Sequence, residues 1–217
     1  MRLLRLYILF WCIACVSSCS RQASDAGQIL PWYDSVLNAG NTVALTDIAA
    51  AQKLVQDAYN TRTDAGAVET YYRQLFLTRF EPDKDVLQAR LDTMLAVTKS
   101  RLQEPTFANM YGYAMLLRAE NLLQKKEYEE ALNCLYEGKK KLADSCLLRQ
   151  YYFTLFGVCY RQEKLVEAAA FQKQGLALMA HCGYNYELYR EKQAKLNDLG
   201  MCYSKMGVND SALMCFD

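Results

Sequence analysis

Apolar residues recur every three or four positions along most of the chain, the spacing that places them on one face of an α-helix. In the segment 47–60, the apolar side chains that share such a face are Ile48, Leu54, Val55 and Tyr59. Segments 68–80 and 83–102 show the same spacing, and Pro105 separates them from the helix that begins near Phe107. The pattern predicts an all-α fold, in which segments 47–60 and 68–80 pack together as a first helical pair.

The N-terminus has the layout of a secretory signal. Arg2 and Arg5 precede an apolar stretch of eleven residues, 6–16, and two serines follow before Cys19. Eleven apolar residues are too few to span a bilayer comfortably, whereas they suit the apolar core of an export signal. We therefore assign residues 1–19 to a signal peptide and residues 20–40 to a tether.

The end of this signal, Val16–Cys19, resembles the lipobox of bacterial lipoproteins. The resemblance implies acylation of the Cys19 thiol, and several acyl chains at roughly 0.8 kcal/mol per buried methylene would hold the protein on a membrane. It implies a chain anchored to the bacterial inner or outer membrane and facing the periplasm or the exterior. Ile13–Cys15 is a rival site, and an ordinary cleaved signal or an uncleaved anchor are the remaining alternatives.

A repeated pattern occupies the second half of the chain. Leu199, Gly200 and Tyr203 are followed by Ala212 and Phe216 at the offsets of the tetratricopeptide repeat, which this segment resembles. Two earlier copies centre on the alanines Ala131 and Ala168. The spacing is 37 residues from Ala131 to Ala168 and 44 residues from Ala168 to Ala212, and both exceed the usual period of about 34. We therefore expect divergent helical pairs over 41–104 and about three repeats over 105–217, the last truncated.

The register of the middle copy is the least certain part of this pattern. Its eighth position, where a small residue lets two helices approach, is assigned to Gly157. Ala168 then comes one residue earlier than that assignment requires. The equivalent eighth positions of the other copies are Ala119 and Gly200.

The resemblance implies a right-handed solenoid of antiparallel helix pairs, with a concave groove that receives a protein or peptide partner. In this family the groove is lined by positions two, five, nine, twelve and thirteen of each first helix. The groove residues implied here are Tyr113, Glu120, Gln124, Tyr151, Thr154, Arg161, Asn197 and Lys205. The lysine and asparagine set that grips a terminal carboxylate in one subclass is not reproduced, which disfavours chaperone-tail binding.

Six cysteines follow Cys19, an even number in a chain predicted to be exported. The repeat register places Cys159 and Cys202 at one equivalent position and Cys134 and Cys215 at another, which favours buried thiols.

The two remaining cysteines, Cys146 and Cys182, lie at the ends of successive repeats. A disulfide between adjacent repeats is one interpretation, and separate loop or core thiols are the other. We favoured thiols because the sequence carries no geometric information on the pair.

Composition adds mainly exclusions. Twenty-five basic and twenty-four acidic residues give a net charge of +1, without the basic patch of a nucleic-acid-binding protein. His181 is the only histidine, and its neighbour Cys182 is too close in sequence to share a substrate atom with it. The chain carries no glycine-rich phosphate loop or paired histidines, and the mature part has no Cys-x-x-Cys pair. We therefore expect a binding protein, with no catalytic residues, no metal and no cofactor.

These observations predict a membrane-anchored extracytoplasmic repeat protein that mediates protein–protein interaction. The alternative is the truncated periplasmic region of a transmembrane sensor, because exported tyrosine-rich repeats of long period resemble the input regions of sensors from Bacteroides-type bacteria. A downstream apolar segment of about 20 residues would separate the two. A carbohydrate-capturing outer-membrane lipoprotein would need a much longer chain.

Overall fold

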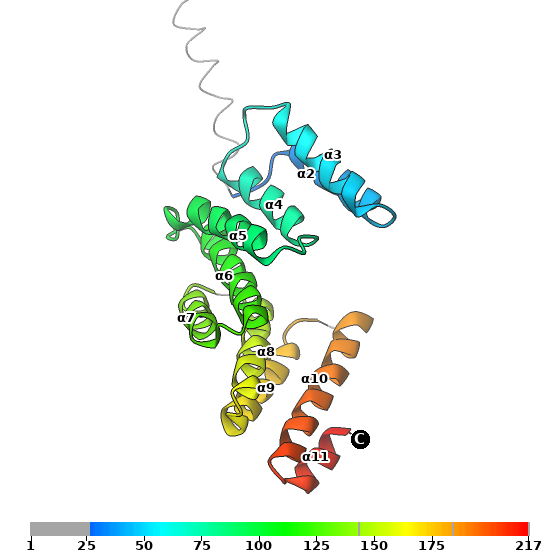
Figure 1. The fold of residues 1–217 in the computed structure, drawn as a ribbon, viewed down its shortest axis with the longest axis vertical. Helices are drawn as coiled ribbons and strands as arrows, with labels where there is room; N and C mark the ends of the chain where they lie inside the picture. The colour runs from blue at the N-terminus through cyan, green and yellow to red at the C-terminus, as the bar shows by residue number, and fades with distance from the viewer. Residues whose placement is uncertain (1–26, 143, 184, 217) are drawn as a thin grey trace, which may run out of the picture. The chain divides into compact units, whose positions relative to one another are not determined.

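The computed structural model describes residues 27–142, 144–183 and 185–216, and within these ranges it contains ten helices and no strand (Figure 1). The all-α prediction is confirmed, and helices adjacent in sequence pack as antiparallel pairs in the manner of a tetratricopeptide-like repeat. Within the described ranges, the residues from 27 to 81 form one compact unit and those from Pro82 onward form another.

The first unit consists of α2 (Pro31–Ala44), α3 (Ile48–Asn60) and α4 (Ala67–Thr78). Its main pair is α2 with α3, packed around the buried rings of Tyr33 and Tyr59. The predicted pair of 47–60 with 68–80 is therefore wrong in its partner, since α3 packs mainly on α2. The tether assigned to 20–40 is wrong from Pro31 onward, because Tyr33 and Leu37 are buried in this core.

A buried carboxylate joins the ends of two helices in the first unit. Glu69 is fully buried, and its two carboxylate oxygens accept hydrogen bonds from the backbone N–H of Leu30 at 3.0 Å and of Gly66 at 2.9 Å. These N–H groups lie at the starts of α2 and α4, where a helix leaves its first donors without backbone acceptors. One side chain thus caps α4 and fixes the entry of α2.

The second unit contains seven of the helices described. They are α5 (Lys84–Lys99), α6 (Pro105–Lys125), α7 (Tyr128–Lys139), α8 (Ser145–Arg161), α9 (Leu165–Met179), α10 (Tyr186–Lys205) and α11 (Asn209–Phe216). The pairs α6/α7, α8/α9 and α10/α11 are the three repeats, and α5 packs on α6. Asp83, Asp144 and Asn185 cap the starts of α5, α8 and α10 by accepting backbone hydrogen bonds.

The turn between the two helices has the same backbone conformation in all three repeats. Lys126, Glu163 and Gly207 adopt the left-handed conformation, with φ of 64°, 60° and 74°. The N–H of the next residue then bonds to the carbonyl five residues before it, at 2.9 Å, 2.9 Å and 3.0 Å respectively. This 6→1 bond is the hallmark of a Schellman turn. The turn therefore provides a structural register common to the three repeats.

Counted back from this turn, the register assigned to the middle repeat is wrong by one residue. Ala119 and Gly200 lie seven residues before Lys126 and Gly207, whereas the residue seven before Glu163 is Phe156. Gly157 is thus not at the small eighth position. The space around Gly157 agrees with this conclusion, because a Cβ built there would meet only Leu123 Cδ2, at an ordinary contact distance of 3.5 Å.

At Gly200 the predicted interlocking of small and large residues is present. A Cβ at this position would lie 2.7 Å from Cζ of the Phe216 ring, closer than real Cβ contacts come. The aromatic residue at the end of the repeat therefore occupies the space that the missing side chain leaves, as the repeat pattern requires.

Three of the four cysteines predicted to be core thiols, Cys134, Cys159 and Cys202, are buried, and Cys215 is half-buried against the core of the last two repeats. The one-residue shift means that Cys159 is equivalent to Tyr203 and not to Cys202, because the carbonyls of Cys159 and Tyr203 accept the equivalent turn bonds.

Cys146 and Cys182 form a disulfide, so the thiol interpretation that the sequence favoured is wrong for this pair. The bond joins the first turn of α8 to the segment after α9, and the two Cα atoms are 5.3 Å apart. The helix pair brings both ends together because α8 and α9 run antiparallel and α8 is only slightly longer.

The predicted signal peptide, 1–19, and the lipidation site Cys19 lie outside the described residues. Among the helices of the described ranges, none has the length and apolar character needed to cross a bilayer.

Candidate binding pocket on the first helices of the repeats

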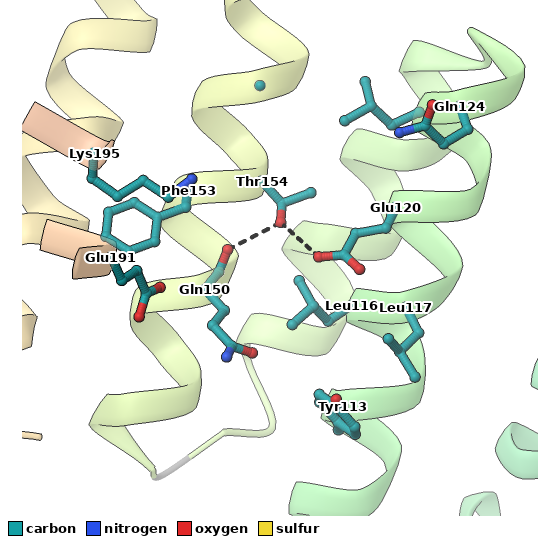
Figure 2. A pocket seen from close by; sticks show the side chains of 12 residues that line it. Tyr113, Leu116, Leu117, Glu120, Gln124, Gln150, Phe153, Thr154, Glu191 and Lys195 are labelled. Atoms are coloured by element: carbon teal, nitrogen blue, oxygen red, sulfur yellow. Dashed lines mark hydrogen bonds between the residues drawn. The ribbon is translucent and has the colours of Figure 1, made fainter. Parts of the chain in front are cut away.

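A pocket of about 520 Å³ lies on α6 and α8, with α10 at its side (Figure 2). Its lining mixes apolar walls with a few polar groups, the composition of a recognition site. The lining residues are Tyr113, Leu116, Leu117, Glu120, Leu123, Gln124, Gln150, Phe153, Thr154, Gly157, Glu191 and Lys195.

Helix α6 presents to this pocket all five positions that the repeat resemblance assigns to a groove. Three of them, Tyr113, Glu120 and Gln124, were predicted from the sequence, and Leu116 and Leu123 complete the set. Positions two, five, nine, twelve and thirteen of a helix lie on one face because they are three or four residues apart or adjacent. One face of α6 is thus the wall of the pocket.

Helix α8 follows the same rule at three of the five groove positions once its register is corrected. Gln150, Phe153 and Gly157 occupy positions two, five and nine counted from the turn, and all three line the pocket. Thr154, predicted in the uncorrected register, lines it as well.

Tyr151 does not belong to the pocket, and its predicted groove role is wrong. The side chain is fully buried, and its hydroxyl donates a hydrogen bond to the Gly112 carbonyl on α6. Burial raises the pKa of this phenol far above its usual value. A one-residue error rotates a helical position by about 100°, which is enough to exchange groove for core.

Helix α10 contributes Glu191 and Lys195, which the repeat positions did not predict. Glu191 pairs with Arg149 at 2.7 Å, and Lys195 Nζ lies 3.5 Å from Asp198 and 5.1 Å from the centre of the Phe153 ring. Glu191 lies before the repeat's first position, in the N-terminal extension of the 20-residue helix α10, so the length of the helix was the available signal for it. Lys195 lies at the third position of the repeat, which the groove rule does not include.

The other predicted groove residues lie elsewhere on the second unit. Arg161 and Asn197 are exposed, and neither lines this pocket. Lys205 is also exposed, and its ammonium lies 4.6 Å from the centre of the Tyr160 ring, a cation–π arrangement.

Glu120 is the electrostatic centre of the pocket. Its carboxylate points from α6 towards Thr154 on α8 (Figure 2), and solvent still reaches it. Partial desolvation by the pocket walls raises the pKa of the Glu120 carboxyl, against a weaker lowering by Thr154 and Lys195. In the part of the chain that the structure describes, this carboxylate forms no ion pair within 4 Å.

Removing this charge should stabilise the protein near neutral pH. A raised pKa means that the folded state disfavours the carboxylate, so the penalty is present above the folded pKa and absent below the ordinary value of 4.5. We expect Glu120→Gln to have a higher Tm than the unaltered protein at pH 7 and the same Tm at pH 3.5. Thermal unfolding at the two pH values measures the difference, with the exposed turn residue changed in Glu163→Gln as control.

An equal effect of Glu120→Gln at both pH values, or a lower Tm at pH 7, would contradict a desolvated charge at this position. The control should show no gain at pH 7, because Glu163 does not line the pocket.

Within the described ranges, no three side chains of His, Cys, Asp and Glu gather in the arrangement of a metal site. The chemistry that the pocket offers is that of two carboxylates, two amides, hydroxyls and an ammonium between apolar walls.

No protein-family model matches the chain, and no curated protein matches it. Among solved structures, the crystal structure of BtubC (BKLC) from P. vanneervenii is similar, with a TM-score of 0.48 and 14% sequence identity over 84% of this chain and 85% of that chain.

Proposed function

We propose that the protein binds an extended segment of a partner protein in the pocket on α6 and α8, and that it does so outside the cytoplasm while anchored to a membrane by lipid at Cys19. The observation that carries the binding proposal is the meeting of the five α6 groove positions with Gln150, Phe153 and Gly157 of α8 in one hollow. Adjacent first helices of helical repeats receive peptides in this way.

The composition of the pocket supports a peptide ligand. Leu117 is partly exposed and offers apolar contact, while Gln124 and Gln150 present amides that can bond to a peptide backbone. Its volume of about 520 Å³ lies within the range of 300–1,000 Å³ usual for ligand sites.

The disulfide supports the export proposal. Cys146 and Cys182 are bonded in a small helical domain, and such bonds persist in oxidising compartments such as the bacterial periplasm. By contrast, the hydrogen bonds of the buried Glu69 carboxyl and of the other helix caps do not depend on the redox conditions of the compartment.

Photo-crosslinking tests the binding proposal. Gln124 is exposed at the pocket, so a benzophenone amino acid at this position should crosslink to a discrete partner in the bacterium that carries the gene. The matched control places the same amino acid at Val166 on α9, which is 68% exposed and does not line the pocket. We expect one recurrent crosslinked partner from position 124 and none from position 166, read by mass spectrometry.

Equal crosslinking from both positions would indicate random collisions, and it would remove the case for this pocket. The same would follow if position 124 gave no crosslink while the chain was folded and present at its usual level.

Acylation of Cys19 has a separate test. Metabolic labelling with an alkyne fatty acid should mark the unaltered chain, and Cys19→Ser should abolish the label and move the protein from the membrane fraction to the soluble fraction. Cys15→Ser is the matched control, because it removes the rival site. Label lost only in Cys15→Ser would assign the lipid to that cysteine, and an unlabelled chain would contradict the anchor.

A further inference from the structure

The Glu120 carboxylate lines a pocket but has little hydrogen bonding to the protein. Among the residues that the structure describes, its one hydrogen-bond partner is the Thr154 hydroxyl, at 3.4 Å. That hydroxyl has a single proton and lies closer, at 3.0 Å, to the Gln150 carbonyl, which is also an acceptor. The proton therefore serves the carbonyl, and the carboxylate is left to solvent inside a hollow whose walls limit hydration.

The other charges at the pocket are already paired. Glu191 bonds to Arg149 at 2.7 Å, and Lys195 lies beside Asp198 at 3.5 Å. The lining itself holds two carboxylates and one ammonium, so its net charge is −1. Glu120 is thus the lining charge that a ligand would neutralise, and the pocket's electrostatic complement is a cation.

The apolar surface beside Glu120 fits the stem of a long basic side chain. Leu117 lies about one turn before Glu120 on α6 (Figure 2), lines the pocket and is partly exposed. Leu116 and Leu123 also line the pocket, but they are buried and add little surface. Lysine and arginine place methylene stems on such surface and their charged heads against a carboxylate. A small metal cation would lack a second free carboxylate here, since Glu191 is held by Arg149.

We propose that the pocket receives a lysine or arginine side chain of the partner segment, whose charged head pairs with Glu120 while its stem lies against Leu117 of α6. This proposal rests on the proposed function and specifies the chemistry of the partner. Burial raises the pKa of the Glu120 carboxyl, which agrees with a site that lacks its counter-ion until the partner binds.

Selection from a random dodecapeptide library displayed on phage tests this specificity, with the full chain purified in detergent as the target. We expect the enriched peptides to share one lysine or arginine and to crosslink to benzophenone at position 124. A synthetic copy of the most enriched peptide should bind Glu120→Gln at least tenfold more weakly than the unaltered protein, and Glu163→Gln within twofold of it.

Replacing the shared basic residue of the peptide by norleucine keeps the stem and removes the charge. It should weaken binding to the unaltered protein at least tenfold and binding to Glu120→Gln less than twofold, because the pair is already broken there. Such a double-mutant cycle assigns the lost affinity to the pair itself.

Two results would overturn the proposal, and they differ in what they leave standing. Peptides that crosslink at position 124 but need no basic residue, or that bind Glu120→Gln undiminished, would remove the cation site and leave peptide binding in place. A selection without any peptide that crosslinks at position 124 would overturn both the cation site and the proposed function.

Discussion

Reduction of the Cys146–Cys182 disulfide should lower the free energy of unfolding of the second unit by about 3–4 kcal/mol. The bond closes a loop with a sequence separation of 36 residues, and the loss of loop entropy in the unfolded chain accounts for a value of this size. The loop contains α8 and α9, so the affected repeat also provides one wall of the pocket. Urea unfolding followed by circular dichroism, with and without reductant, measures the effect.

The double variant Cys146→Ser and Cys182→Ser provides the control. It should unfold at the urea concentration of the reduced protein and should not respond to reductant, because the thiols of Cys134, Cys159 and Cys202 are buried and unbonded. Equal free energies of unfolding for the reduced and the oxidised protein would contradict this prediction, because the disulfide would then add no constraint that stabilises the fold.

The helices of this protein follow from local signals that a sequence displays directly. Segment 47–60 and helix α3 differ by one residue at the start, because Asp47 caps the helix from outside it. Pro105 was predicted to separate two helices, and it occupies the first position of α6, where its missing N–H costs nothing. Periodicity and capping are properties of neighbouring residues, so they need no knowledge of distant contacts.

The register of the middle repeat could also have been predicted correctly. Ala168 lies four residues after Lys164, as Ala131 and Ala212 lie four residues after Glu127 and Val208. Counting back from that alanine leads to Phe156 at the eighth position. The prediction instead took Gly157 as the reference residue and ignored the turn. As a result it placed Tyr151 in the groove, where the structure has Gln150 and Phe153.

Contacts between segments distant in sequence were beyond the sequence pattern. The pairing of α2 with α3 depends on Tyr33, Tyr59 and their neighbours filling one core, and periodicity does not specify which face meets which. The same applies to Glu191 and Lys195, which reach the pocket because α10 packs on α9 beside α8. Such contacts depend on the three-dimensional path of the chain between the segments.

Gly138→Ala should destabilise the second unit by about 2–3 kcal/mol, despite the better helix propensity of alanine. The added Cβ would lie 2.7 Å from Cβ of Met115 and would also overlap the buried side chain of Tyr151. Because Met115 Cβ is fixed to the backbone of α6, relief requires α7 to move away from α6 or Tyr151 to give up its hydrogen bond to Gly112. Thermal and urea unfolding of the purified variant measure the loss.

Gly157→Ala is the matched control, because both glycines lie in helices and only their surroundings differ. At Gly157 the new Cβ would meet Leu123 Cδ2 at 3.5 Å, an ordinary contact, so alanine should raise the free energy of unfolding by about 0.5–1 kcal/mol through helix propensity alone. Opposite signs for the two variants would confirm that Gly138 separates tightly packed helices and that Gly157 does not occupy the small position of its repeat. Destabilisation of Gly157→Ala comparable to that of Gly138→Ala would instead restore the uncorrected register, with Gly157 at the close approach.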